Sequence, residues 1–176
     1  MFAPLEHWHE FYLLTGTAAA ALVALQFVAA SLGAGYLSFE KAAASRTYMT
    51  PVIVHFSAVL YACAVGLVPS HTALTFSLAI GIAAAIGFLY SGSIVLSVLK
   101  DPVVDLGDKL CYGIAPPIGY AAGVGAAILF HFDSRHAAGV LAVALLVLLI
   151  VNIRNAWDLT LFMARKHTEA KQPPAP

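Results

Sequence analysis

The amino-acid sequence predicts an all-α integral membrane protein, a bundle of five transmembrane helices with its N-terminus outside and its C-terminus in the cytoplasm. Of the 176 residues, 61% are apolar and only 10% are charged, a composition far from that of soluble domains. The apolar residues form five long runs separated by short polar loops. Lysine and arginine are concentrated in alternate loops, and this asymmetry gives the orientation.

The first three apolar runs predict helices over residues 11–36, 50–68 and 72–99. Each run supplies about the 20 helical residues that cross a hydrocarbon core. The first run is too long for the core of a signal peptide and no lysine or arginine precedes it, so we expect a retained helix. Pro51 falls in the first turn of the second helix, where its missing N–H does no harm, and Ser70 can cap the third.

The last two predicted helices cover residues 110–132 and 137–164. Asp108 precedes the fourth helix and can cap it. Pro116 and Pro117 lie inside the fourth helix, and neither can donate a backbone hydrogen bond to the carbonyls one turn earlier. Those carbonyls need another partner, such as water or a ligand in a cavity.

The loops that hold lysine and arginine give the orientation through the positive-inside rule. Arg135 is in a loop on one side and Arg154 is inside the fifth helix, whereas the remaining cations share the opposite side: Lys41, Arg46, Lys100, Lys109, Arg165, Lys166 and Lys171. That side is expected to be the cytoplasm. Residues 1–166 are then one transmembrane domain, and the polar, proline-rich residues 167–176 are a disordered cytoplasmic tail. The net charge of zero argues against a nucleic-acid partner.

Small residues recur at four-residue spacing in three of the predicted helices. They are Gly16, Ala20 and Ala24 in the first, Ser77, Gly81 and Ala85 in the third, and Gly119 and Gly123 in the fourth. Such faces let helix backbones approach closely within lipid. They are expected to serve packing inside the chain, and a homo-oligomer through the same faces stays open because five helices form a thin bundle.

Polar residues inside the predicted helices are the candidate binding residues. A charge at that depth costs about 2.5–3.5 kcal/mol on insertion scales, so it needs a reason. Arg154 and Asp158 are four residues apart on the fifth helix and can pair along one face. Counting about 1.5 Å per residue from the cytoplasmic ends places other polar residues at similar depths, and the candidate set is Arg154, Asp158, Asn155, His55, Tyr90 and Gln26. The set is compatible with a pocket open to the cytoplasm and also with a structural Arg154–Asp158 clip.

Most histidines map to the side opposite the cytoplasm, where several imidazoles could hold zinc or copper if their loops converge. The candidate metal ligands are His7, His9, His71, His131 and His136. Their spacing matches no strong local metal motif, and histidine is also common at helix ends for reasons of solvation. A response to pH is a further alternative, since free imidazoles titrate near neutrality.

Two segments resemble a group of small, uncharacterised bacterial inner-membrane proteins. The first helix contains FYLLTGTAAAAL over residues 11–22, and the last contains IRNAWDL over residues 153–159. Thr50-Pro51 and His55-Phe56 between them add to the similarity. The resemblance implies a bacterial origin, the cytoplasmic (inner) membrane as location and a multi-pass architecture. It assigns no catalytic or binding residue.

The function expected from these features is binding or translocation of a small ion or polar solute through a cytoplasm-facing pocket, with Arg154 as fixed charge and Asp158 as counter-charge. One alternative is a non-catalytic accessory or scaffold subunit of a membrane complex. A second is an extracytoplasmic metal-binding protein. No catalytic residue is predicted, because no nucleophile-and-base pair or nucleotide motif stands out. No cofactor is predicted, and zinc or copper is the metal that the histidines could hold.

Overall fold

The computed structural model describes residues 5, 7–33, 42–100 and 106–171, with side chains for residues 5, 7–31, 50–95 and 106–161. This part of the chain consists of helices and turns and contains no strand. Five helical stretches are long and apolar enough to cross a membrane, namely His9–Ser31, Thr50–Leu67, Ala73–Val95, Leu106–His131 and Ala137–Leu161. The predicted all-helical class with five membrane-length helices is therefore confirmed for the described residues.

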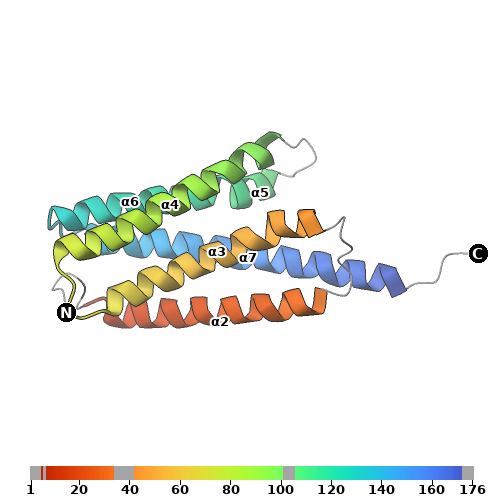
Figure 1. Cartoon of the computed structure of the whole chain (residues 1–176), viewed down its shortest axis with the longest axis horizontal. Coiled ribbons are helices and arrows are strands. Elements are labelled where there is room, and N and C mark those ends of the chain that lie inside the picture. Colours follow the sequence, from red (N-terminus) through yellow and green to blue (C-terminus); the bar gives the residue numbers. More distant parts are fainter. Residues whose placement is uncertain (1–4, 6, 34–41, 101–105, 172–176) are drawn as a thin grey trace, which may run out of the picture.

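The helices form an elongated bundle of roughly aligned rods (Figure 1). Their bounds are α2 (His9–Gly33), α3 (Ala42–Leu67), α4 (Ala73–Lys100), α5 (Leu106–Asp108), η2 (Lys109–Ile114), α6 (Ala115–His131) and α7 (Ala137–Lys171). α2 packs along α3, α4 packs along α6, and α7 contacts both pairs. α3 and α4 contact each other much less than either contacts its own partner. Toward the end of the bundle where α7 finishes, α4 diverges from α3 (Figure 1).

The bounds of α3 and α7 differ from the prediction. α3 begins at Ala42 instead of residue 50, so Pro51 lies inside the helix and not in its first turn. α7 continues to Lys171, so residues 167–171 are helical where the sequence predicts a disordered tail. Both extensions are rich in alanine, arginine, lysine or glutamate, which favour helix even outside an apolar run. Residues 172–176 lie outside the described part of the chain.

The fourth membrane-length stretch is not a uniform α-helix. It begins at Leu106, earlier than the predicted residue 110, and its segment Lys109–Ile114 is the π-helix η2. The N–H of Ala115 donates to the carbonyl of Leu110, five residues back, as in a π-helix. Asp108 makes no side-chain capping hydrogen bond, so its predicted role as an N-cap is wrong. Its carboxylate instead binds a cation on another helix.

Glycine residues let neighbouring helices approach closely. A Cβ added to Gly119 on α6 would lie 2.9 Å from Cγ and Cδ2 of Leu148 on α7. A Cβ added to Gly123 would lie 3.2 Å from Cβ of Ala84 on α4. The other glycines of the predicted small-residue faces, Gly16 and Gly81, meet a neighbouring helix in the same way. These small residues from the predicted faces therefore serve packing within the chain.

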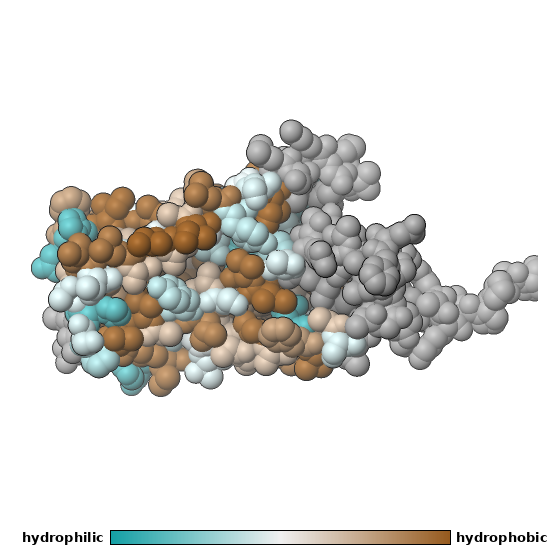
Figure 2. All heavy atoms as spheres, in the orientation of Figure 1, coloured by the Kyte–Doolittle hydropathy of each residue, from teal (hydrophilic) through white to brown (hydrophobic). Residues whose placement is uncertain are grey.

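Large apolar side chains remain on the outside of the bundle. Leu14 is 72% exposed and Leu89 is 73% exposed, and apolar side chains cover much of the visible face (Figure 2). A soluble monomer rarely exposes apolar surface on this scale, because water orders unfavourably around it. Hydrocarbon in place of water removes that cost, which matches helices of membrane-spanning length.

Substitution of Gly119 tests the close contact between α6 and α7. We expect Gly119→Ala to destabilise the fold by about 1–3 kcal/mol, because the new methyl group displaces Leu148. The matched control is Gly125→Ala on the same helix, where an added Cβ meets nothing within 4 Å. Thermal unfolding in detergent measures both variants, and an equal change in the two melting temperatures would contradict the packing argument.

Candidate functional site

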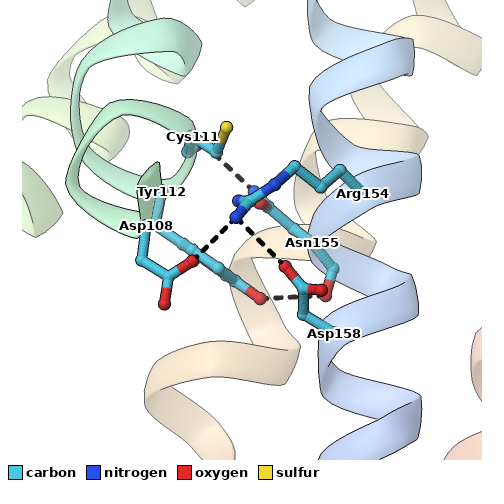
Figure 3. Close-up of polar contacts among 6 residues, drawn as sticks. All are labelled: Asp108, Cys111, Tyr112, Arg154, Asn155 and Asp158. Carbon is cyan, nitrogen blue, oxygen red and sulfur yellow. Dashed lines mark hydrogen bonds and ion pairs between the residues drawn. The ribbon is translucent and has the colours of Figure 1, made fainter. Parts of the chain in front are cut away.

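The predicted pocket residues separate into two clusters. Arg154, Asn155 and Asp158 of α7 meet the start of the fourth membrane-length stretch (Figure 3). His55 of α3 and Tyr90 of α4 lie in a second cluster, formed around a tyrosine that the sequence reasoning did not select. The structure therefore does not unite all the candidates in one site. The sixth, Gln26, is buried on α2, and its Oε1 has no hydrogen-bond partner among the described residues.

Arg154 lies between two carboxylates. Its Nη2 donates a hydrogen bond to Oδ1 of Asp108 at 3.0 Å and lies 3.5 Å from Oδ2 of Asp158 (Figure 3). The expected Arg154–Asp158 pair is thus present, and Asp108 is the partner that sequence reasoning missed. Its place just before the fourth predicted helix suggested a cap, and sequence spacing gives no sign that α7 passes beside it. The three side chains are each about 40% exposed, at 42%, 43% and 40% for Arg154, Asp108 and Asp158.

Asn155 connects α7 to η2 through its side-chain amide nitrogen and its backbone carbonyl. Its side-chain Nδ2 donates to the backbone carbonyl of Cys111 at 3.2 Å. Its own backbone carbonyl accepts a hydrogen bond from Oη of Tyr112 at 2.8 Å (Figure 3). Asn155 is only 1% exposed, so these bonds are shielded from competing solvent. Together with the Asp108–Arg154 pair they attach η2 and α5 to α7.

The chemistry of the Arg154 cluster fits a structural contact better than a binding site for an anion. Two carboxylates surround one guanidinium, so the cluster carries a formal charge of −1 when all three groups are ionised. An incoming anion would meet repulsion from Asp108 and Asp158. The Arg154–Asp158 contact expected of a clip is present and includes Asp108 as a third residue, and the surrounding carboxylates disfavour an anion at this place.

His55 forms the centre of the second cluster. Its side chain is buried, with the residue 2% exposed, and its Nδ1 lies 2.8 Å from Oη of Tyr120 on α6. Either the ring N–H or the hydroxyl donates, depending on the tautomer. The Tyr90 ring stands at an angle to the imidazole with 6.2 Å between centroids. Three helices therefore place hydrogen-bonding side chains together, and Tyr120 went unselected because it lies in an apolar run without a charge or motif.

A groove of about 570 Å³ opens between α3 and α4 beside the His55 cluster. Its walls are mostly apolar and carry no charged residue: Val54, Ser57, Ala58, Tyr61, Ala79, Ile82, Ala83, Ile86, Gly87, Tyr90 and Tyr120. Tyr120 lines the groove and contacts His55 behind it. The hydroxyl-bearing residues of this apolar lining are Ser57, Tyr61, Tyr90 and Tyr120. Its volume lies in the range of small-molecule sites, which is about 300–1,000 Å³.

The predicted metal ligands are dispersed in the structure. Within the described part of the chain, no three His, Cys, Asp or Glu side chains lie close enough to hold a metal ion together. His71 Nδ1 lies 3.3 Å from Oγ1 of Thr75, and His136 Nε2 accepts a hydrogen bond from Arg135 Nε at 3.3 Å. The remaining candidates are exposed: His7, His9 and His131. Their side chains therefore have ordinary local contacts or solvent around them.

Comparison with protein-family models, with curated proteins and with solved structures finds no match to this chain. The geometry of the two clusters and the groove is therefore the basis for the functional argument.

The metal hypothesis is tested by the metal content of protein purified without a histidine tag. We expect less than stoichiometric zinc or copper by mass spectrometry, because the described histidines do not converge. Stoichiometric metal that is lost on replacement of His7 and His9 would contradict this expectation.

The Arg154 clip is tested by a double-mutant cycle with Asp108. Arg154→Leu is expected to lower the melting temperature, since it leaves two carboxylates facing each other without their cation. Asp108→Asn in the same chain should recover part of that loss, with a coupling energy of about 1 kcal/mol for a half-exposed pair. A coupling energy of zero would show that the observed ion pair does not stabilise the fold.

Proposed function

We propose that this chain is a multi-pass protein of the bacterial inner membrane that binds a small, neutral, mostly apolar solute in the groove between α3 and α4. The orientation in this proposal has the N-terminus outside and the C-terminus in the cytoplasm, as the distribution of lysine and arginine favours. The apolar outer face of the bundle supports insertion in a bilayer. The resemblance of residues 11–22 and 153–159 to bacterial inner-membrane proteins supports the location.

The observation that carries the proposal is the groove itself. It combines the volume of a small-molecule site with mostly apolar walls and a few hydrogen-bonding side chains. Tyr90 and Tyr120 can each offer a hydroxyl to a carbonyl or hydroxyl on the solute. Nδ1 of His55 lies 2.8 Å from Oη of Tyr120, so this hydroxyl is already oriented before a ligand arrives.

The lining also defines the chemical class of the solute. A charged solute in an uncharged groove within hydrocarbon would lose its hydration without gaining a counter-charge. A neutral molecule with an apolar body and one polar group loses little hydration free energy. Its body matches the apolar side chains of the wall, and its polar group matches the hydroxyl-bearing ones. The proposal thus keeps His55 and Tyr90 from the predicted pocket, whereas Arg154, Asp158 and Asn155 become structural residues. It replaces the ion or polar solute expected from sequence with a neutral amphiphile.

A second candidate function is an accessory subunit whose groove receives a helix of a partner protein. Ala79, Ala83 and Gly87 are spaced four residues apart on α4, and all three line the groove. Small residues at this spacing let a second helix approach closely in lipid. The polar cluster at Tyr90, Tyr120 and His55 favours the small solute over this alternative, because a packed helix would need a matching polar group at the same depth.

Filling the groove tests the proposal. We expect Ala83→Phe to reduce a co-purified neutral lipid-like molecule by roughly tenfold or more, a loss of about 1.4 kcal/mol in binding, because the new ring occupies the groove. The measurement is solvent extraction of protein purified in mild detergent, followed by mass spectrometry of neutral compounds. The matched control is Ala85→Phe, on the same helix at an exposed position outside the groove lining.

The outcomes separate the two candidate functions. A neutral compound retained by the parent and by Ala85→Phe, and lost from Ala83→Phe, supports the solute site. A protein subunit released from the purified complex only by Ala83→Phe supports the partner helix. Equal content of neutral compounds in all three proteins overturns the proposed site.

A further inference from the structure

The backbone is interrupted where η2 meets α6. In a regular α-helix the ring of Pro116 would clash with the carbonyl of residue 112, and the wider π-helical turn before it relieves this contact. Ala115 donates to Leu110 in the π register. The next carbonyl in that register is that of Cys111, and its partner by count would be Pro116, whose nitrogen has no hydrogen to donate. Helical hydrogen bonding therefore does not continue from Cys111 into α6.

A side chain of another helix supplies the missing donor. Asn155 Nδ2 on α7 donates to the Cys111 carbonyl at 3.2 Å, so the bond that α6 cannot make is made by α7. The Asp108–Arg154 pair and the bond from Tyr112 to the Asn155 carbonyl add two more contacts to the same helix. Residues 106–114 are thus joined to α7 by three side-chain contacts, beside the point where the helical hydrogen bonding is interrupted.

We infer that residues 106–114 are a hinged arm, closed against α7 by the Asn155 and Arg154 contacts and hinged at Ala115-Pro116-Pro117. The arm also packs against α4, more extensively than against α7, so opening would separate it from both helices. Opening does not leave the Arg154 guanidinium without a counter-charge. Its Nη2 lies 3.5 Å from Oδ2 of Asp158, one turn away on the same helix. Opening breaks both hydrogen bonds between η2 and Asn155, and the side-chain bond to the Cys111 carbonyl, which replaces the donor that Pro116 lacks, is the latch. This inference is independent of the proposed solute site.

Cys111 reports directly on the state of the arm. The chain has two cysteines, both free thiols, of which Cys63 is buried and Cys111 is half-buried in η2. In a Cys63→Ala background Cys111 is the single thiol, and its rate of modification by a small maleimide measures how often the arm is open. The experiment uses the full chain in detergent and again in liposomes.

Asn155→Leu is expected to raise the Cys111 modification rate by roughly tenfold, because leucine has nearly the same size but cannot donate to the Cys111 carbonyl. The matched control is Asn152→Leu. Asn152 is buried one turn earlier on α7, and its Nδ2 donates to Leu148 of the same helix at 2.6 Å. This control removes an equivalent amide without touching the arm, so its rate should stay within about twofold of the parent.

Pro116→Ala tests the hinge separately from the latch. Alanine restores a backbone N–H that can bond to the preceding turn, so the arm becomes continuous with α6. In this background Asn155→Leu is expected to have much less effect on the Cys111 rate. If Asn155→Leu yields no folded protein, Asp108→Asn replaces it, with an expected rise of roughly threefold from loss of the half-exposed ion pair.

The inference is overturned by any of three results. The first is an unchanged Cys111 rate in Asn155→Leu, or in Asp108→Asn where that variant replaces it. The second is an equal rise in Asn155→Leu and Asn152→Leu, which would indicate general loosening of α7. The third is a full rise in Asn155→Leu that persists with Pro116→Ala, which would place the flexibility elsewhere than at the prolines.

Discussion

Backbone carbonyls buried among apolar helices require hydrogen-bond donors, and the two prolines of the fourth membrane-length stretch remove donors at one place. The bundle meets this constraint with the π-helix η2 and with Asn155 of α7, whose side chain bonds to the Cys111 carbonyl. α7 lies beside η2, where its Asn155 side chain meets this requirement. Arg154, the next residue along, is thereby brought within reach of Asp108.

The same arrangement gives the two polar clusters different roles. The Arg154 cluster is half-exposed, ion-paired on both sides and attached to an interrupted backbone, which suits a structural contact that can open. In the second cluster His55 and Tyr120 are buried. The cluster adjoins the groove between α3 and α4, whose lining carries no charged residue. Charge in the first cluster stabilises a position, whereas hydroxyl groups in the second are available to a solute in the proposed function.

Close glycine contacts explain why the groove lies between α3 and α4. Gly119 and Gly123 draw α6 against α7 and α4, and Gly16 draws α2 against α3. α3 and α4 belong to different closely packed pairs and contact each other less, so the space between them stays open. Gly87 leaves room for the Tyr120 ring, which reaches across to His55.

The sequence by itself determined the helical class, the number of membrane-length helices and the Arg154–Asp158 pair, because hydropathy and four-residue spacing are local properties of one helix. It did not determine which polar residues meet across helices. Asp108 resembled a helix cap, Tyr120 resembled an apolar neighbour, and Pro116 gave no indication that Asn155 would replace its missing donor. Only the tertiary structure decided these contacts, because they depend on the lateral order of the helices and on the rotation of each helix about its axis. The periodicity of a single helix determines neither.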